Sequence, residues 1–297
     1  MSGAWLEQRE RGSLAALRAM TWVARSLGDS AARALLAPIC LYFLAFAPKA
    51  RAASREFLCR ALGRRAALGD VYRHFHTFAS TLLDRVALLS GNHADFDVRL
   101  HGAGALEAAL AARRGCLLLG SHLGSFEVLR VLGEARRGVV VNLVMHEANA
   151  RLASQWSRAL APELQARIIA PGQPDTLLRV RECLERGEVV AMLGDRVLHG
   201  RRSIACDFLA GRARFPAGPL LAAALLGAPV VTFFCLYRAP RRYDVHFALL
   251  AERLPAERPA RDAAVASALQ AFAAQLEAHA RAAPRNWFNF YDFWRDG

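Results

Sequence analysis

Lysine is almost absent from this chain: Lys49 is the one lysine among 39 basic residues, and the others are arginine. The six cysteines are scattered without a C-x-x-C pair, which argues against a zinc site or a disulfide framework and predicts reduced, buried thiols. Charges occur throughout the first 18 residues, so a cleavable signal sequence is not expected. A hydrophobic share of 54% is too low for a protein that crosses a membrane many times.

Positive charge is what the sequence has in abundance. The formal net charge is +13 over 297 residues, and arginine binds phosphates and carboxylates with a planar fork of donors. We therefore expect anionic partners, such as membrane headgroups, a phosphorylated substrate or an acidic carrier protein. Nucleic acid is not expected, because no nucleic-acid motif is present and the arginines are spread along the chain rather than gathered in a stripe.

One apolar segment near the start suggests contact with a membrane. Residues 34–47, ALLAPICLYFLAFA, carry no charge, with Arg33 before them and Lys49 and Arg51 after them. The run is shorter than the roughly 20 residues needed to span a bilayer, and Pro38 is expected to interrupt it. We interpret it as a helix that lies in, or dips into, one leaflet; a buried core helix is the alternative.

Beyond this segment, the pattern changes once along the chain. Apolar residues recur at helical spacing over 54–89, and after Gly91 short strand patterns alternate with helical ones. This predicts an α/β fold: a central, mostly parallel sheet flanked by helices, with an N-terminal membrane-associated helical segment. We assign residues 1–90 to that segment and 91–297 to the α/β domain. Strands are expected at 116–121, 138–145, from 166, 188–195, 228–238 and 242–250, the last two paired, and helices at 175–186, 218–226 and 262–281.

The segment Gly120–Arg130, GSHLGSFEVLR, follows a predicted strand and opens a predicted helix. His122 therefore lies at the carboxyl end of a strand, where α/β sheets bind their ligands. In a continuous helix Glu127 would point about 140° away from it, but Gly124 allows a bend that brings the two side chains together. A neutral histidine oriented by a carboxylate can take a proton from a hydroxyl that attacks an acyl carbon. The helix amino end nearby would favour negative charge.

Several blocks carry a family resemblance. His122 and Glu127 match a His-x-x-x-x-Asp/Glu motif within GSHxGxxE, although Ser125 stands where asparagine is expected. The other blocks are GDR at 194–196, FPxGP at 215–219, GAPV at 227–230 and NWFNFYDFW at 286–294. From about Ala34 to its end, the chain resembles the lysophospholipid acyltransferase superfamily, and within it the lipid A biosynthesis acyltransferase branch.

The resemblance implies an acyltransferase in which His122 is the general base and Glu127 its partner. Arg196 would bind an anionic part of a substrate, with Asp195 positioning it. An arginine-containing loop over 201–214 would meet headgroup phosphates or an acidic carrier protein. The substrate-binding residues expected on this basis are Ser121, Gly124, Ser125, Asp195, Arg196 and Arg214.

Other motifs are given structural interpretations. The aromatic tail at 286–294 is expected to pack on the core rather than anchor in a membrane. Asp84-Arg85 also resembles the family, and an intrahelical surface charge pair explains it equally well. The remaining histidines are expected to be structural, without a metal, and no recognisable partner is found for His146, His199 and His246.

The sequence thus predicts an enzyme that needs no cofactor and no metal. Its donor would be an acyl carrier protein or coenzyme A thioester, its acceptor a hydroxyl or amine of a lipid or glycolipid. Its place would be the cytoplasmic face of a bacterial inner membrane, as a peripheral or monotopic protein. Two alternatives stay open: a serine-type lipid esterase or thioesterase using Ser121 or Ser125, and a non-catalytic basic protein that binds membranes.

Overall fold

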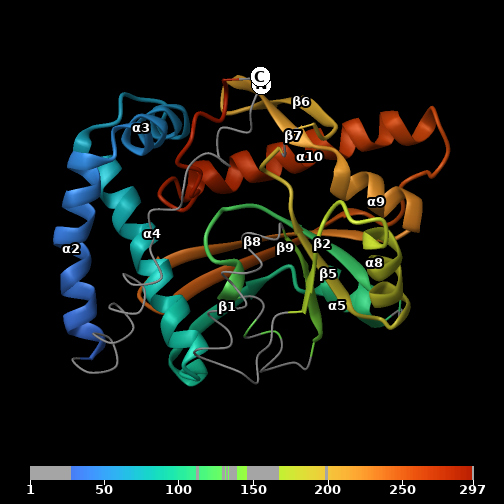
Figure 1. The fold of residues 1–297 in the computed structure, drawn as a ribbon, viewed down its shortest axis with the longest axis horizontal. Coiled ribbons are helices and arrows are strands. Elements are labelled where there is room, and N and C mark those ends of the chain that lie inside the picture. The colour runs from blue at the N-terminus through green and yellow to red at the C-terminus, as the bar shows by residue number, and fades with distance from the viewer. Residues whose placement is uncertain are drawn as a thin grey trace.

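Figure 1 shows the fold of the computed structural model, which describes residues 28–111, 114–128, 131, 133, 139–145, 167–197 and 200–295. Predictions for the first 18 residues, His146 and His199 lie outside the described residues, as do the starts of two predicted strands, Gly138 and Ala166. The helices are α2 Asp29–Phe46, α3 Pro48–Leu62, α4 Leu68–Leu89, α5 Gly104–Ala111, α8 Thr176–Glu185, α9 Gly218–Leu226 and α10 Ala260–Ala282.

A seven-stranded sheet in the order β1-β9-β8-β2-β5-β3-β4 forms the centre of the fold. The five strands from β8 to β4 are mutually parallel, whereas β9 runs antiparallel to β8 and pairs in parallel with β1. The predicted α/β fold and the predicted pairing of the last two strands are confirmed. The strands are β1 Asp97–His101, β2 Cys116–Gly120, β3 Val141–Val144, β4 Arg167–Ile169, β5 Val189–Leu193, β8 Val230–Ala239 and β9 Arg242–Ala251.

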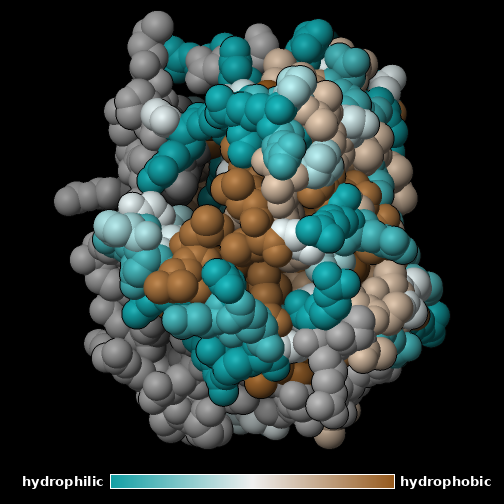
Figure 2. Space-filling view, turned by 90° about the vertical axis from the view of Figure 1, so that its right-hand side faces the viewer, coloured by the Kyte–Doolittle hydropathy of each residue, from teal (hydrophilic) through white to brown (hydrophobic). Residues whose placement is uncertain are grey.

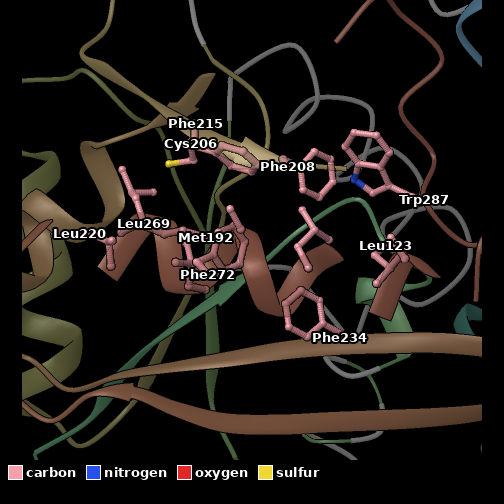
Figure 3. Close-up of a cluster of buried hydrophobic side chains, with 14 of the residues drawn as sticks. Leu123, Met192, Cys206, Phe208, Phe215, Leu220, Phe234, Leu269, Phe272 and Trp287 are labelled. Atoms are coloured by element: carbon pink, nitrogen blue, oxygen red, sulfur yellow. The ribbon is translucent and has the colours of Figure 1, made fainter. Parts of the chain in front are cut away.

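Side chains of the central strands alternate between two apolar layers, because successive residues of a strand face opposite sides. In β2, Leu117 and Leu119 join a core shared with α8, α9 and α10, part of which is shown in Figure 3. Cys116 and Leu118 join a second core with α5 and the end of α4. Since both faces are covered, the strand reads as a continuous apolar run.

A hairpin stands where we predicted an arginine-containing loop. β6 Ser203–Phe208 and β7 Gly211–Pro216 form a separate two-stranded antiparallel sheet. The prediction was wrong because the arginines conceal an alternating strand pattern: Ala213 and Phe215 are buried, while Arg212 and Arg214 beside them are exposed.

Helix α2 continues for 18 residues through Pro38, so the predicted interruption is not present. It is long and apolar enough to cross a membrane by length and composition, and 17% of it is buried. Core helices of soluble proteins pass the same test. Its exposed large apolar side chains are Leu35, Leu41, Tyr42 and Phe46.

Asp84 of α4 ties α2 to the sheet from a fully buried position. Its carboxylate accepts hydrogen bonds from the Arg33 guanidinium of α2 (2.6 Å), the backbone amide of Arg241 (2.9 Å) and the Tyr243 hydroxyl (2.8 Å). A surface charge pair of Asp84 with Arg85 is therefore ruled out, because this carboxylate points into the protein and toward other donors.

The residues after α10 pack on the core, which confirms the interpretation of the aromatic tail. Trp287 is fully buried, and its ring lies 5.3 Å from that of Phe208 in β6, centroid to centroid (Figure 3). His74 of α4 is also buried, with its Nδ1 2.8 Å from the Ser54 hydroxyl and its Nε2 2.9 Å from the Trp287 carbonyl oxygen. His74 thus joins α3, α4 and the tail, in keeping with the structural role expected of it.

The buried His74 ring makes stability depend on pH. Burial lowers the pKa of His74 from 6.5 to about 4, although the bond to the Trp287 carbonyl opposes this shift. Between these values the unfolded chain takes up a proton that the folded chain does not, so the free energy of unfolding falls as the pH falls through this window. We expect His74 to lower the free energy of unfolding by about 3 kcal/mol between pH 7 and pH 4.

Urea unfolding at pH 7 and pH 4 checks this prediction, with His74→Gln compared against wild type. The variant should lose about 3 kcal/mol less than wild type over that interval, and the matched His76→Gln should behave as wild type. An equal loss in wild type and His74→Gln would contradict the assignment.

Candidate active site at the carboxyl edge of the sheet

His122 and Asp195 meet because their strands are neighbours. β2 and β5 pair in parallel with Gly120 opposite Leu193, and each residue follows two positions after its strand ends. Carboxyl ends of adjacent parallel strands lie at one edge of a sheet. His122 Nδ1 is 2.8 Å from Asp195 Oδ1.

Asp195 is fully buried and surrounded by donors. Its Oδ2 accepts hydrogen bonds of 2.9 Å from the backbone amide of His122, the Trp287 indole and the Asn289 side-chain amide. Although burial acts to raise the pKa of Asp195, the charge and hydrogen bonds of His122 lower it to about 2. The carboxylate is therefore ionised and accepts hydrogen bonds only.

The ionised Asp195 sets the tautomer of His122. Since the carboxylate can only accept, Nδ1 of the ring carries the hydrogen, and Nε2 carries the lone pair in the neutral ring. The His122 side chain is 23% exposed, so solvent reaches it. This arrangement suits a general base with a fixed orientation.

Glu127 forms an ion pair with a residue of helix α4. Its Oε1 accepts a 2.7 Å hydrogen bond from Nη2 of Arg85 on α4, and its side chain is 8% exposed. The carboxylate that contacts Nδ1 of His122 is that of Asp195, whereas the resemblance assigns the orienting role to Glu127. Asp84-Arg85 resembles the family in sequence, but the contact of Arg85 with Glu127 was not predicted, because no sequence spacing links α4 to the segment after β2.

The loop after His122 is fixed by its backbone. The amide of Gly124 donates to the Asn286 carbonyl (2.7 Å), and the amide of Ser125 donates to the Cys235 carbonyl (3.0 Å). With the amide of His122 bound to Asp195, these three amides are used within the protein, so the helix start offers fewer donors to an anion than expected. Ser121 and Ser125 are both buried.

Gly124 is required by this close packing. Its φ is +78°, and an added Cβ would overlap the carbonyl oxygen of Cys235. We expect Gly124→Ala to lower the free energy of unfolding by about 3 kcal/mol, from steric overlap together with the left-handed backbone penalty, and to impair the adjacent His122. Gly69→Ala is the matched control, because no atom lies within 4 Å of its Cβ, and it should be neutral or slightly stabilising. Urea unfolding measures both; equal stabilities would contradict the prediction.

The two arginines predicted to bind a substrate, Arg196 and Arg214, lie in different parts of the fold. Arg196 donates from Nε to Oδ1 of Asn289 (2.8 Å) and from Nη2 to the Phe288 carbonyl (3.2 Å), so it holds the tail beside the site. Asp195 hydrogen-bonds His122, a contact that was not predicted; the resemblance implies that Asp195 positions Arg196. Arg214 lies on the exposed face of β7, with Nη1 3.5 Å from the Ser203 hydroxyl.

The tail contributes directly to the site, and the sequence interpretation missed this. Asn286 bonds both backbone groups of Tyr237, at the end of β8, while Trp287 and Asn289 bond Asp195. The amide of Phe288 also donates to the His122 carbonyl (2.8 Å). The alternation of asparagines and aromatic residues in NWFN is the signal that the sequence offers, since it indicates both packing and hydrogen bonding.

These features define a class: an α/β enzyme with a histidine–carboxylate pair at the carboxyl edge of a mostly parallel sheet. The chain matches the family of bacterial lipid A biosynthesis acyltransferases over residues 10–296, and it belongs to that family. It is therefore an acyltransferase of lipid biosynthesis, as the resemblance implied. A search of curated proteins gave no match.

Proposed function

We propose that this acyltransferase moves a fatty acyl group from an acyl carrier protein or coenzyme A thioester to a hydroxyl, or an amine, of a lipid or glycolipid acceptor. His122 is the general base and Asp195 its orienting carboxylate. The observation that supports this reading is the 2.8 Å contact between His122 Nδ1 and a fully buried, ionised Asp195. Family membership supplies the reaction class.

In the proposed reaction, Nε2 of His122 takes the proton of the acceptor hydroxyl as its oxygen attacks the thioester carbonyl. The tetrahedral intermediate then expels the thiolate, which receives that proton from the imidazolium. Asp195 stabilises the imidazolium between these steps. The acceptor itself is the nucleophile, so we propose neither a covalent acyl-enzyme nor a catalytic metal or cofactor.

For Glu127 we propose a supporting role beside this pair. Its carboxylate, paired with Arg85, joins α4 to the helical residues 126–128 that follow the His122 loop. Removing Arg85 from this partly buried ion pair would leave the buried Glu127 carboxylate without that cation, which is costly. Glu127 would thereby hold the loop in place.

A serine hydrolase gains no support from the geometry. The Ser121 hydroxyl is buried and has no hydrogen-bond partner among the described residues, whereas a serine nucleophile must be bonded to its base. Mass spectrometry of the protein after incubation with donor should show no acyl-serine, and detecting one would favour the hydrolase.

We also propose that the protein binds the cytoplasmic face of the inner membrane through α2 and α3. The exposed apolar residues of α2 lie next in the chain to an open groove on α3 and the start of α4, lined by Arg51, Arg55, Arg60 and Arg65. Apolar side chains beside arginines suit an interface of acyl chains and anionic headgroups.

A second apolar area, on the side with α8 and α9, is ringed by hydrophilic residues (Figure 2).

Vesicle flotation tests the membrane proposal. The protein should float with vesicles containing phosphatidylglycerol and be released by high salt or mild detergent, and Tyr42→Ser/Phe46→Ser should float about tenfold less. The control Leu249→Ser removes an exposed leucine of β9 and should float as wild type. Equal flotation of all three proteins would contradict the role of α2.

Lipid mass spectrometry tests the function as a whole. Lipids of cells with and without the protein should differ by one acyl chain on one lipid class, and His122→Ala should fail to restore it. Purified protein given acyl carrier protein and coenzyme A thioesters separately then identifies the donor. No acylated lipid in cells or in the purified reaction would overturn the proposal.

A further inference from the structure

Two histidines and an aspartate gather at the edge of the sheet formed by β1 and β9. One ligand atom from each of His101, Asp244 and His246 lies within 4.8 Å of the other two. The rings of His101 and His246 are stacked, with centroids 4.5 Å apart and planes at 11°. His246 also contacts the His279 ring of α10 at 4.7 Å, a partner that could not be recognised in the sequence.

Strand register brings these side chains together. β1 and β9 are parallel, and His101 lies opposite His246. Asp244 precedes His246 by two positions, so both side chains project from the same face of β9. Gly102, next to His101, has a φ of +69°, and a Cβ there would overlap the Phe247 carbonyl oxygen. The end of β1 is thus held tightly against β9.

One polar atom of this cluster has no hydrogen-bond partner among the described residues. It is Nε2 of His246, which is buried, and burial without a partner is costly for a polar atom. Asp244 binds Arg238 Nε through Oδ2 at 2.7 Å, while its Oδ1 is the oxygen 3.9 Å from Nε2 of His101. One carboxylate oxygen therefore faces the histidines.

We propose that His101, Asp244 and His246 bind a divalent transition metal, with Zn²⁺ the best match. Two imidazoles and one carboxylate are a donor set that zinc takes, with water in the fourth position. Ligand atoms around zinc lie about 3.3 Å apart, so the three side chains, whose ligand atoms lie within 4.8 Å of one another here, close in by up to about 1.5 Å on binding. The two stacked imidazole rings also turn, so that their lone pairs meet at the ion.

The proposed ion is a link between strands and takes no part in acyl transfer. β9 and β8 lie between β1 and the strand that carries His122, and β1 is the edge strand of the sheet. A metal that bridges β1 and β9 joins this edge to the core. Binding to the folded state alone stabilises it.

Calorimetry of chelator-treated, full-length protein with ZnCl₂ tests the site. Wild type should bind one Zn²⁺, and His101→Ala should bind at least about tenfold more weakly. His76→Ala, a histidine outside the cluster, should bind as wild type. Arg238→Gln should bind more tightly, since it removes a competing cation from Asp244. With cobalt, wild type should show visible absorption that His101→Ala lacks.

The variants separate this site from other zinc ligands and from catalysis. All six cysteines remain in every variant, so binding by thiols would persist in His101→Ala. His101 is half exposed, so its replacement leaves the fold intact, and acyl transfer without zinc should equal wild type. Absence of saturable zinc binding, or wild-type affinity in His101→Ala, would overturn the proposal and leave the acyltransferase assignment unaffected.

Discussion

His122→Ala is expected to lower acyl transfer by about 10³-fold or more. The variant lacks the nitrogen that takes the acceptor proton, and general-base catalysis is commonly worth 10²–10⁴-fold. An alcohol at neutral pH is almost entirely protonated, so its attack on a thioester depends on this proton transfer. The measurement is initial-rate transfer of a labelled acyl chain from thioester to lipid, once the active donor is known.

The fold should survive this substitution. Asp195 keeps three donors on Oδ2, and Oδ1 loses a ring that was partly exposed, so a water molecule can replace it. We expect the free energy of unfolding to change by about 1 kcal/mol. His122→Gln retains a donor toward Asp195 and should be just as inactive. His76→Ala should transfer at the wild-type rate; unchanged turnover in His122→Ala would contradict the mechanism.

Much of the fold follows from periodicity in the sequence. The runs around Leu117, Val190 and Val231 are apolar at almost every position because both faces of the sheet are covered. Helices α8, α9 and α10 fall within a few residues of their predicted bounds. The hairpin of β6 and β7 was missed because the arginines that alternate with buried residues in β7 resemble a polar loop.

Only part of the candidate site's geometry could be predicted, for a reason that lies in strand order. His122 is a candidate base because a strand, a turn and a helix are adjacent in sequence around it. Its partner on Nδ1, Asp195, is 73 residues away, and the two meet because β5 lies beside β2. The periodicity of apolar residues along the chain does not determine which strands are neighbours in the sheet. The GDR block was recognised, but its aspartate was assigned to position Arg196.

The same limit applies to the edge cluster. His101 and His246 are far apart in sequence and meet through the register of β1 and β9. β1 itself was not predicted. Pairs across strands thus depend on sheet topology, whereas His74, whose buried apolar helix face was visible at helical spacing, was correctly interpreted as structural.

Asp195→Asn is expected to lower kcat by about 10³- to 10⁴-fold while KM changes little, because it reverses one hydrogen bond. Oδ2 accepts from three donors, so the amide oxygen of asparagine takes that place. The amide NH₂ then points at Nδ1 of His122. The ring must accept there, its hydrogen moves to Nε2, and the lone pair that takes the acceptor proton is lost.

Comparison with Glu127→Gln decides which carboxylate orients the base. Glutamine keeps an oxygen for Arg85, so the contact between α4 and the loop persists in neutral form. If Asp195 is the orienting group, kcat should fall at least about tenfold further in Asp195→Asn than in Glu127→Gln. Thermal unfolding controls for stability, since both variants replace one buried carboxylate by an amide of the same shape. A greater loss of kcat in Glu127→Gln than in Asp195→Asn would show that Glu127, not Asp195, orients the His122 ring. An effect on folding alone would not reverse the order of the two kcat values.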